Sequence, residues 1–322
     1  MNLLKNLKEI NFFIYKNKKL KKYNKIHFYI FTILIKMFGI ITNQINFRLY
    51  YRLSKLISFF ISDDVICKIK ILKDTNFIFY LNDSYYNQLI FKGYRHDVEI
   101  ENLLNKIKDI KYMFFDVGAN YGYFSSIASS KIYGSKKTVA VEPVKKNYSM
   151  CRINCKSNNS RFKIINKGVG EKESKKIIYV DSKSRAGVAS SLSKPNDIET
   201  NKELIHITPM NKILNKYKTN KNFVIKLDIE GEEINCLKNI NNNLKNRLLI
   251  IYEDHGKDNR NIPTKYLLKK GYKVFIGLDK KIIQIKKNND LIKLKKRKTV
   301  GYNLFATKAK EFMPHLNNGW NL

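Results

Sequence analysis

Residues 114–124 read FFDVGANYGYF, a pattern that predicts a buried strand, a glycine-containing bend and the start of a helix. The apolar run at 112–117 carries Asp116 at its end, as expected of a central parallel strand buried on both faces. Gly118 and Gly122 permit a tight bend, after which 124–132 continues as a predicted helix. A strand, a glycine bend and a helix in this order bring backbone N–H groups close to a ligand.

The next predicted strand indicates which ligand the bend holds. KTVAVEP at 137–143 places Glu142 26 residues after Asp116, where a carboxylate accepts both hydroxyl groups of a ribose. The G-x-x-x-x-G-K-[ST] motif of triphosphate sites is absent, and the G-x-x-x-G spacing at Gly118 departs from the G-x-G-x-x-G of dinucleotide sites. A nucleoside without phosphates is therefore favoured. S-adenosylmethionine is the common one, with its aminoacyl tail over the bend and its ribose against Glu142.

Strand and helix patterns then alternate to the end of the chain. Helices are predicted at 147–158, 209–217, 232–240 and 263–271, and strands at 162–170, 176–180, 222–231, 248–256, 272–277 and 300–308. Repeated βα units of this kind imply a doubly wound α/β fold, with a mostly parallel sheet and helices on both faces. We expect an antiparallel edge strand, with the last two strands joined by a long basic turn at 286–298.

Four segments carry a specific family resemblance. DVGANYGYFS at 116–125, VAVEPVKKNYSMCRINCKSN at 139–158, IKLDIEGEEINCLKNI at 225–240 and YEDH at 252–255 occur in the order and spacing of the FkbM-like methyltransferases. The chain resembles that family from about residue 85 to residue 308. The resemblance implies a Rossmann-like class I methyltransferase fold, S-adenosyl-L-methionine as cofactor, and O-methylation of a hydroxyl acceptor, often a sugar of a glycan or a small-molecule natural product.

The resemblance also suggests site residues by position. The implied cofactor residues are Asp116, Gly118, Ala119, Asn120, Gly122 and Glu142. Asp228 and Glu230 mark the end of the fourth core strand, and Glu253 and His255 follow the fifth.

Methyl transfer to a hydroxyl group requires alignment of the acceptor oxygen and a base that takes its proton as the bond forms. His255 is the preferred base, because it follows a predicted core strand beside two acids, and Glu253 or Asp254 is placed to orient it. The alternative is a loop histidine that caps a helix.

Asp228 and Glu230 have three predicted roles: they bind the acceptor, act as base, or hold a divalent cation together with Glu232 or Asp254. A structural alternative is that they cap the following helix. We predict catalytic roles and no bound metal.

The amino-terminal segment 1–62 holds twelve Lys and Arg residues and one acid, Glu9, around the apolar run 28–42. A helix over that run is only about 22 Å long, too short for a hydrocarbon core of roughly 30 Å. Thr32, Lys36, Gly39 and Asn43 form one polar stripe on it. This pattern fits a helix lying on an anionic membrane surface, and it fits a helix packed under a domain equally well.

The net charge of +35 comes mainly from Lys, which a compositional bias places on any solvated face, so it is weak support for nucleic-acid binding. An RNA base methyltransferase would carry N/D-P-P-[YF] where this chain has DIEG at 228–231. Nucleic acid is therefore not the expected partner, although an RNA, lipid or other small-molecule acceptor remains the alternative to a glycan. Four cysteines without a disulfide framework fit a reducing cytoplasm, with a peripheral place at the inner membrane face as the alternative.

These patterns predict that the chain is divided into three parts. Residues 1–84 form a basic extension with the amphipathic helix and a β-hairpin, residues 85–310 the methyltransferase domain, and residues 311–322 a tail. The small polar segment 181–197 is either a substrate lid or a flexible linker.

Overall fold

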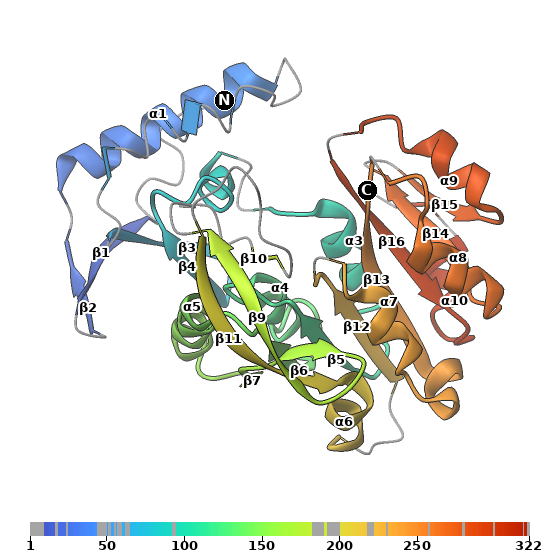
Figure 1. The fold of residues 1–322 in the computed structure, drawn as a ribbon. Helices are drawn as coiled ribbons and strands as arrows, with labels where there is room; N and C mark the ends of the chain where they lie inside the picture. Colours follow the sequence, from blue (N-terminus) through green and yellow to red (C-terminus); the bar gives the residue numbers. More distant parts are fainter. Residues whose placement is uncertain are drawn as a thin grey trace.

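The computed structural model describes residues 10–16, 19–23, 25–43, 50, 53–54, 56, 60–61, 65–91, 95–181, 190–191, 200–217, 222–229, 231–256, 258–278, 281–298, 300–317 and 319–320. Within this part of the chain the strands form one eight-stranded sheet and two four-stranded sheets, which Figure 1 shows with their helices.

The large sheet has the strand order β15-β14-β16-β13-β12-β5-β6-β7. Its strands are β5 (Tyr112–Val117), β6 (Lys137–Val141), β7 (Phe162–Ile165), β12 (Asn222–Leu227), β13 (Leu248–His255), β14 (Lys273–Leu278), β15 (Lys281–Ile285) and β16 (Gly301–Thr307). The five strands from β13 to β7 are parallel, whereas β16 runs antiparallel between β13 and β14, and β15 is antiparallel at the edge. The predicted doubly wound α/β fold is confirmed.

Helices cover both faces of this sheet because side chains of the buried strands alternate between two cores. On one side lie α3 (Val98–Lys106), α4 (Tyr123–Ala128), α5 (Lys145–Ser157) and α10 (Met313–Asn317). On the other lie α6 (Met210–Asn215), α7 (Glu233–Lys238) and α8 (Ile262–Lys269). The order reversal between β12 and β5 places the carboxyl ends of these strands at a switch point, where such folds bind ligands.

Two sequence predictions of local structure were wrong. Segment 286–298 is not simply a turn, because it contains the helix α9 (Asn288–Leu294), which follows the edge strand β15. The strand predicted at 162–170 is two strands in different sheets, β7 and β8 (Gly168–Gly170). The chain leaves the large sheet at Asn166, whose amide donates to the carbonyl groups of Glu142 and Pro143.

The second sheet is built on a long hairpin and has the order β10-β9-β11-β8. Its strands β9 (Ser174–Asp181) and β11 (Thr200–Pro209) pair antiparallel, β10 (Ser190–Ser191) lies at one edge, and β11 pairs parallel with β8. The predicted lid or linker at 181–197 falls here, but residues 182–189 and 192–199 lie outside the described residues.

The third sheet belongs to the amino-terminal segment. Its order is β2-β1-β3-β4, made of β1 (Asn11–Lys16), β2 (Lys19–Lys22), β3 (Val65–Leu72) and β4 (Thr75–Tyr80). The hairpin expected after residue 69 is confirmed as β3 and β4, and the helix expected at 28–42 is α1 (Ile26–Asn43).

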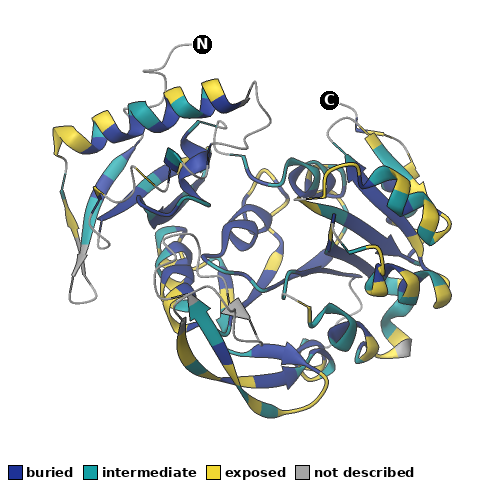
Figure 2. Cartoon of the chain, turned by 45° about the horizontal axis from the view of Figure 1, so that its top comes forward, coloured by how far each residue is buried: buried dark blue, intermediate teal, exposed yellow. Residues whose placement is uncertain are grey.

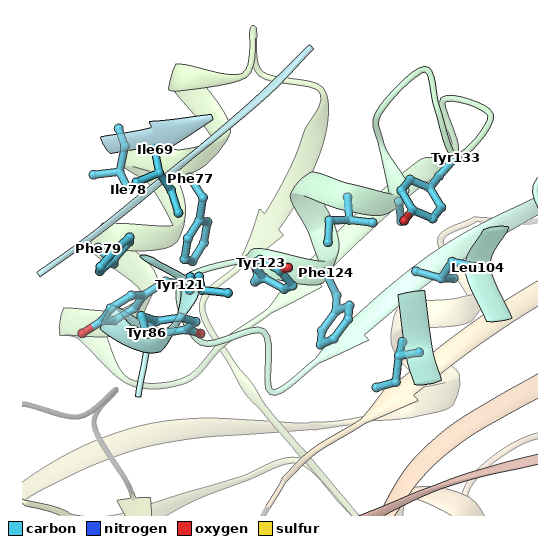
Figure 3. Close-up of a cluster of buried hydrophobic side chains, with 14 of the residues drawn as sticks. Ile69, Phe77, Ile78, Phe79, Tyr86, Leu104, Tyr121, Tyr123, Phe124 and Tyr133 are labelled. Atoms are coloured by element: carbon cyan, nitrogen blue, oxygen red, sulfur yellow. The ribbon is translucent and has the colours of Figure 1, made fainter. Parts of the chain in front are cut away.

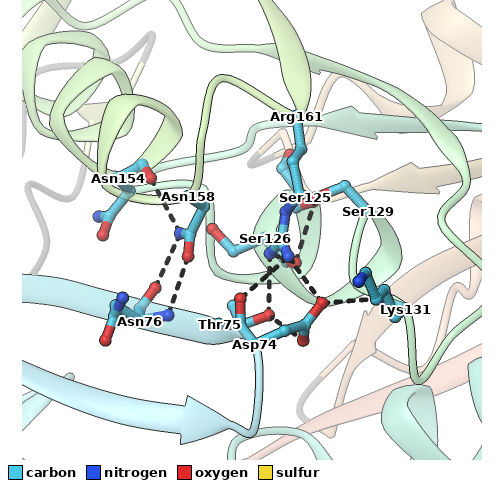
Figure 4. Close-up of polar contacts among 10 residues, drawn as sticks. All are labelled: Asp74, Thr75, Asn76, Ser125, Ser126, Ser129, Lys131, Asn154, Asn158 and Arg161. Carbon is cyan, nitrogen blue, oxygen red and sulfur yellow. Dashed lines mark hydrogen bonds and ion pairs between the residues drawn. The ribbon is translucent and has the colours of Figure 1, made fainter.

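Polar side chains of α5 and of the residues just after it hold this third sheet against the rest of the protein, as Figure 4 shows. Asn158 donates to the carbonyl group of Asn76 and accepts from its N–H group, and Asn154 makes the same pair of bonds with Ile78. The guanidinium of Arg161 lies 2.8 Å from a carboxylate oxygen of Asp74. The edge of β4 is thereby completed by side chains instead of another strand.

One apolar core runs from the third sheet to the face of the large sheet that carries α3 and α4. Figure 3 shows its aromatic centre, where Phe77 and Phe79 of β4 face Tyr86, Tyr121 and Tyr123. The ring centroids of Tyr86 and Tyr121 lie 4.8 Å apart in a stacked arrangement. This packing brings the segment before α3 over the glycine bend.

Candidate active site

The glycine bend follows β5, and three of its residues adopt the left-handed backbone conformation that glycine and asparagine tolerate best. Gly118, Asn120 and Gly122 have positive φ angles of 78°, 51° and 81°. A Cβ atom at Gly118 would collide with the carbonyl oxygen of Asp228, so only glycine lets the bend pack against the end of β12. The N–H groups of Gly118 and Ala119 donate to Val141, which ties the bend to β6.

Glu142 lies at the end of β6 and closes the bend from the other side. Its carboxylate accepts from the N–H groups of Asn120 at 2.8 Å and Val144 at 2.9 Å. Burial raises the pKa of Glu142 to about 7, although these hydrogen bonds favour the charged form. The predicted residues Asp116, Gly118, Ala119, Asn120, Gly122 and Glu142 therefore come together at the ends of β5 and β6.

Three buried oxygen atoms around the bend have no hydrogen-bond partner among the residues that the structure describes: Asp116 Oδ1, Asn120 Oδ1 and Asn147 Oδ1. The other oxygen of Asp116 accepts from the N–H and hydroxyl groups of Ser125, at 3.0 and 2.7 Å. Unsatisfied buried acceptors cost stability unless a ligand or water donates to them. The bend is thus prepared for a ligand that brings hydrogen-bond donors.

The neighbouring strand β12 places a buried ion pair at the same edge. Lys226 Nζ lies 2.9 Å from Asp228 Oδ2, and the ammonium also stands 5.3 Å from the centre of the Phe124 ring. Burial alone would lower the pKa of Lys226, but the charges of Asp228 and Asp116 together raise it. The lysine is therefore a fixed positive charge between two acids.

Glu253, near the end of β13, is a second carboxyl group at this sheet edge whose pKa is raised. Burial raises its pKa to about 7, and the negative charges of Asp228 and Asp97 add to this effect, while His255 and Lys226 oppose it. His255 Nδ1 lies 3.8 Å from Glu253 Oε1, and the imidazole is 61% exposed. Gly301 of β16 leaves the space for the Glu253 side chain, because a Cβ atom there would overlap its carboxylate.

The segment before α3 brings further polar groups toward these acids. His96 is buried and its Nε2 lies 2.6 Å from the hydroxyl of Tyr85 and 3.4 Å from Asp97 Oδ2. Burial raises the pKa of Tyr85 well above its usual value, and the charges of Asp97, Asp228 and Glu253 add to the shift. Tyr85 and Asp97 therefore stand near the acids at the ends of β12 and β13.

The remaining predicted site residues have other partners. Asp254 faces away from Glu253 and pairs with Lys295 at 2.9 Å, so it does not orient His255. Glu232 pairs with Lys176, also at 2.9 Å. Glu230 lies outside the described residues. In the described part of the chain, the acids proposed to share a cation with Asp228 are thus engaged by lysines.

Sequence patterns missed Lys226, Tyr85, His96 and Asp97 as members of this site. Lys226 had a usable signal, because a lysine interrupts the otherwise apolar strand NFVIKL at 222–227, which the fold buries on both faces. Tyr85, His96 and Asp97 had none, since they reach the site only through the packing of the third sheet.

Residues 116–274 match the family model described as the methyltransferase FkbM domain. A search of curated proteins finds no match for the chain.

Solved structures with a similar arrangement include several methyltransferases. Methyltransferase FkbM of Methylobacillus flagellatus KT is 16% identical with a TM-score of 0.40, over 61% of this chain and 43% of that one. Precorrin-6y C5,15-methyltransferase of Geobacter metallireducens GS-15 is 13% identical with a TM-score of 0.40, over 67% and 89%. TYW2 of P. horikoshii, solved with MeSAdo, is 14% identical with a TM-score of 0.39, over 77% and 73%. The match thus spans less than half of the Methylobacillus protein.

Proposed function

Residues 116–274 match the model of the methyltransferase FkbM domain, and from this similarity we propose that the chain transfers a methyl group from S-adenosylmethionine to a hydroxyl group, on a sugar of a glycan or a related metabolite. One observation supports a hydroxyl group as the methyl acceptor. Glu253, a carboxylate with a pKa of about 7, stands beside Asp228 at the same sheet edge as the glycine bend.

The hydrogen-bond acceptors at the bend fit the donor groups of S-adenosylmethionine. Asp116 Oδ1 and Asn120 Oδ1 are buried acceptors without a partner in the described part of the chain, as an aminoacyl ammonium requires. Glu142 has lone pairs left after its two backbone hydrogen bonds, which suits ribose hydroxyl groups. When bound, the cofactor supplies a methyl group on a sulfonium centre, which is transferred by in-line displacement.

The acids at the ends of β12 and β13 would bind and activate the acceptor. A sugar hydroxyl group is a weak nucleophile, and a base poised near neutrality that takes its proton gives about 10²- to 10⁴-fold in rate. Glu253 meets this condition through its pKa of about 7. His255, at 3.8 Å, would stabilise the carboxylate or take the proton onward to solvent.

Asp228 would orient the acceptor, since Lys226 fixes its carboxylate by the 2.9 Å ion pair. The second carboxylate oxygen is then available to accept from a hydroxyl group. Glu230, two residues further, is proposed to serve the same acceptor. Holding the acceptor oxygen in line with the methyl group is the main contribution that such a site makes to the rate.

The charge of this edge favours a neutral acceptor over RNA. Burial raises the pKa of Glu253, and the negative charges of Asp228 and Asp97 add to this shift. Phosphate groups next to the reacting atom would meet these three acids and be repelled. Sugar hydroxyl groups, in contrast, donate hydrogen bonds to carboxylates.

The test uses S-adenosylmethionine labelled in its methyl group and the purified chain. Cell-surface glycan from a strain lacking the gene, a total lipid extract and total RNA are offered separately as acceptors. We expect label in the glycan, stable to mild alkali as an ether is, and a gain of one methylene mass per modified sugar. Label that ribonuclease releases from RNA, or that alkali releases as a carboxyl ester, would overturn the proposal.

A further inference from the structure

Helix α1 packs Phe28, Phe31 and Ile35 into the core together with its polar side chains, and it also presents a second apolar side to solvent. Thr32 and Lys36 are buried, with exposed fractions of 0% and 6%. The exposed side carries Ile26 at 79%, Ile30 at 52%, Met37 at 41% and Ile41 at 56%. Figure 2 shows these exposed positions along the outer side of the helix. A helix on a protein surface in water normally exposes a polar side.

The exposed side is a continuous stripe. At 100° per residue, positions 26, 30, 33, 37, 40 and 41 fall within an arc of about 100°. All six are Ile or Met, and we call them the α1 stripe: Ile26, Ile30, Ile33, Met37, Ile40 and Ile41. The 18 residues of α1 make this stripe about 27 Å long.

Packing on the inner side prevents the helix from rolling to hide the stripe. The ring of Phe12 lies 5.4 Å from that of Phe28 and 5.0 Å from that of Tyr29. Gly39 lies against the ring of Phe91, where a Cβ atom would not fit. The hydroxyl group of Thr32 donates to the Tyr29 carbonyl, so it needs no water.

Basic residues adjoin the stripe. Residues 1–62 hold twelve Lys and Arg residues against one acid. Lys21, Lys22 and Lys25 are exposed just before α1 begins. Each basic residue near an anionic leaflet contributes about 1 kcal/mol to binding, and exposed Ile and Met side chains contribute by entering the acyl boundary. None of the described helices is long and apolar enough to cross a bilayer.

We propose that the α1 stripe docks this protein onto an anionic membrane surface, with α1 lying in the interface and Lys21, Lys22 and Lys25 at the head groups. A second copy of the chain is a poorer occupant, because it would bring two strongly basic segments together.

The test is sedimentation of the full chain with vesicles. One set contains equal parts of phosphatidylglycerol and phosphatidylcholine, and the other only phosphatidylcholine. The variant Ile30→Glu/Met37→Glu changes two exposed positions of the stripe, and Leu204→Glu/Ile262→Glu makes the same charge change at positions 54% and 43% exposed elsewhere. Thermal unfolding checks that both variants keep the wild-type fold.

We expect the wild type and the Leu204→Glu/Ile262→Glu control to bind the anionic vesicles, less tightly as salt is raised. The stripe variant should lose at least about 30-fold in partition coefficient, because two apolar contacts are replaced by charges. Failure of the wild type to bind anionic vesicles, or equal binding by the stripe variant, overturns the proposal. So does a concentration-dependent dimer in sedimentation velocity that the stripe variant abolishes while vesicles bind neither protein.

Discussion

The ammonium of Lys226 lies 2.9 Å from the carboxylate of Asp228, and the backbone carbonyl of Asp228 in turn fills the space beside Gly118. The acceptor side and the cofactor side of the site thus share one residue. Lys226→Met removes the positive charge between Asp228 and Asp116. We expect a loss of about 2 kcal/mol in the free energy of unfolding, less than for a fully buried pair because the Asp228 side chain is 35% exposed.

The same variant should also move the pH dependence of activity. Lys226 lowers the pKa of Glu253, so its removal raises that pKa and shifts the acid-side midpoint of the rate upward. Lys295→Met is the matched control, since it breaks the buried Lys295–Asp254 pair at 2.9 Å on the other side of the strand. The control should be destabilised but keep the wild-type midpoint. Equal midpoints in both variants would contradict a role for Lys226 in the site.

Glu253 should set the pH dependence of the methyl transfer rate. Its carboxylate form predominates above a pKa of about 7, so wild-type activity rises with pH through that value. Glu253→Gln should remove this rise and lower the rate at high pH by about 10²-fold. His255→Ala should raise the midpoint with a smaller loss in rate, because the imidazolium lowers the pKa of Glu253.

Steady-state rates across pH separate this assignment from its alternative. Should His255→Ala lose about 10²-fold at every pH while Glu253→Gln keeps its rate, His255 is the base. Cofactor affinity, measured by calorimetry, should stay near wild type in both variants, since the bend is made by other strand ends.

Cofactor affinity should itself depend on pH through Glu142. Burial raises the pKa of this carboxyl group to about 7, and only its ionised form accepts from both ribose hydroxyl groups. The dissociation constant should therefore fall as pH rises through about 7 and level off above it. Calorimetric titration at several pH values measures this, and Glu142→Gln should bind more weakly with a flat profile. A wild-type affinity that is constant across this range would rule out Glu142 as a ribose ligand.

Gly118 should be required for the stability of the fold as well as for cofactor binding. Gly118→Ala combines a positive φ of 78° with a collision against the Asp228 carbonyl, and we expect a loss of about 3 kcal/mol in the free energy of unfolding. Gly271→Ala is the matched control, with φ of 77° but only ordinary contacts around its Cβ position, and should lose about 1 kcal/mol. Urea unfolding of both variants decides whether the collision matters: similar losses would show that it does not.

Local patterns were enough to predict most of the large sheet. β5, β12 and β13 are short apolar runs ending in acids, and the helices between them carry a clear period, so each βα unit could be recognised by itself. The helix α9 was missed because 286–298 is dominated by Lys and Asn. The break between β7 and β8 was missed because it depends on Asn166 bonding to the end of another strand.

Only those site residues that lie at the ends of predicted strands could be predicted from the sequence. Asp116, Glu142, Asp228 and His255 were placed correctly at the sheet edge, since parallel strands bring their carboxyl ends together. Distant segments that pack over this edge, such as the one holding His96, leave no periodic signal. On α1, the sequence revealed a polar stripe but not the side on which it lies, because either side of such a helix can face the protein.

Asn154 should be among the most important polar residues for the attachment of the third sheet. Its side chain accepts from the N–H group of Ile78 at 2.7 Å and donates to the carbonyl groups of Ile78 at 2.8 Å and Tyr121 at 2.9 Å, all in a buried environment. Figure 4 shows it beside Asn158, the residue that follows the end of α5. Because Asn154→Ala leaves three buried backbone groups without partners, we expect a loss of about 3 kcal/mol in the free energy of unfolding. Asn239→Ala is the control, since it removes a single 3.0 Å bond to the carbonyl group of Asn235 and should cost about 1 kcal/mol or less. Urea unfolding measures both, and amide hydrogen exchange should show faster exchange in β4 for Asn154→Ala alone. If the two variants unfold at the same urea concentration, the side chains of α5 do not hold the edge of β4.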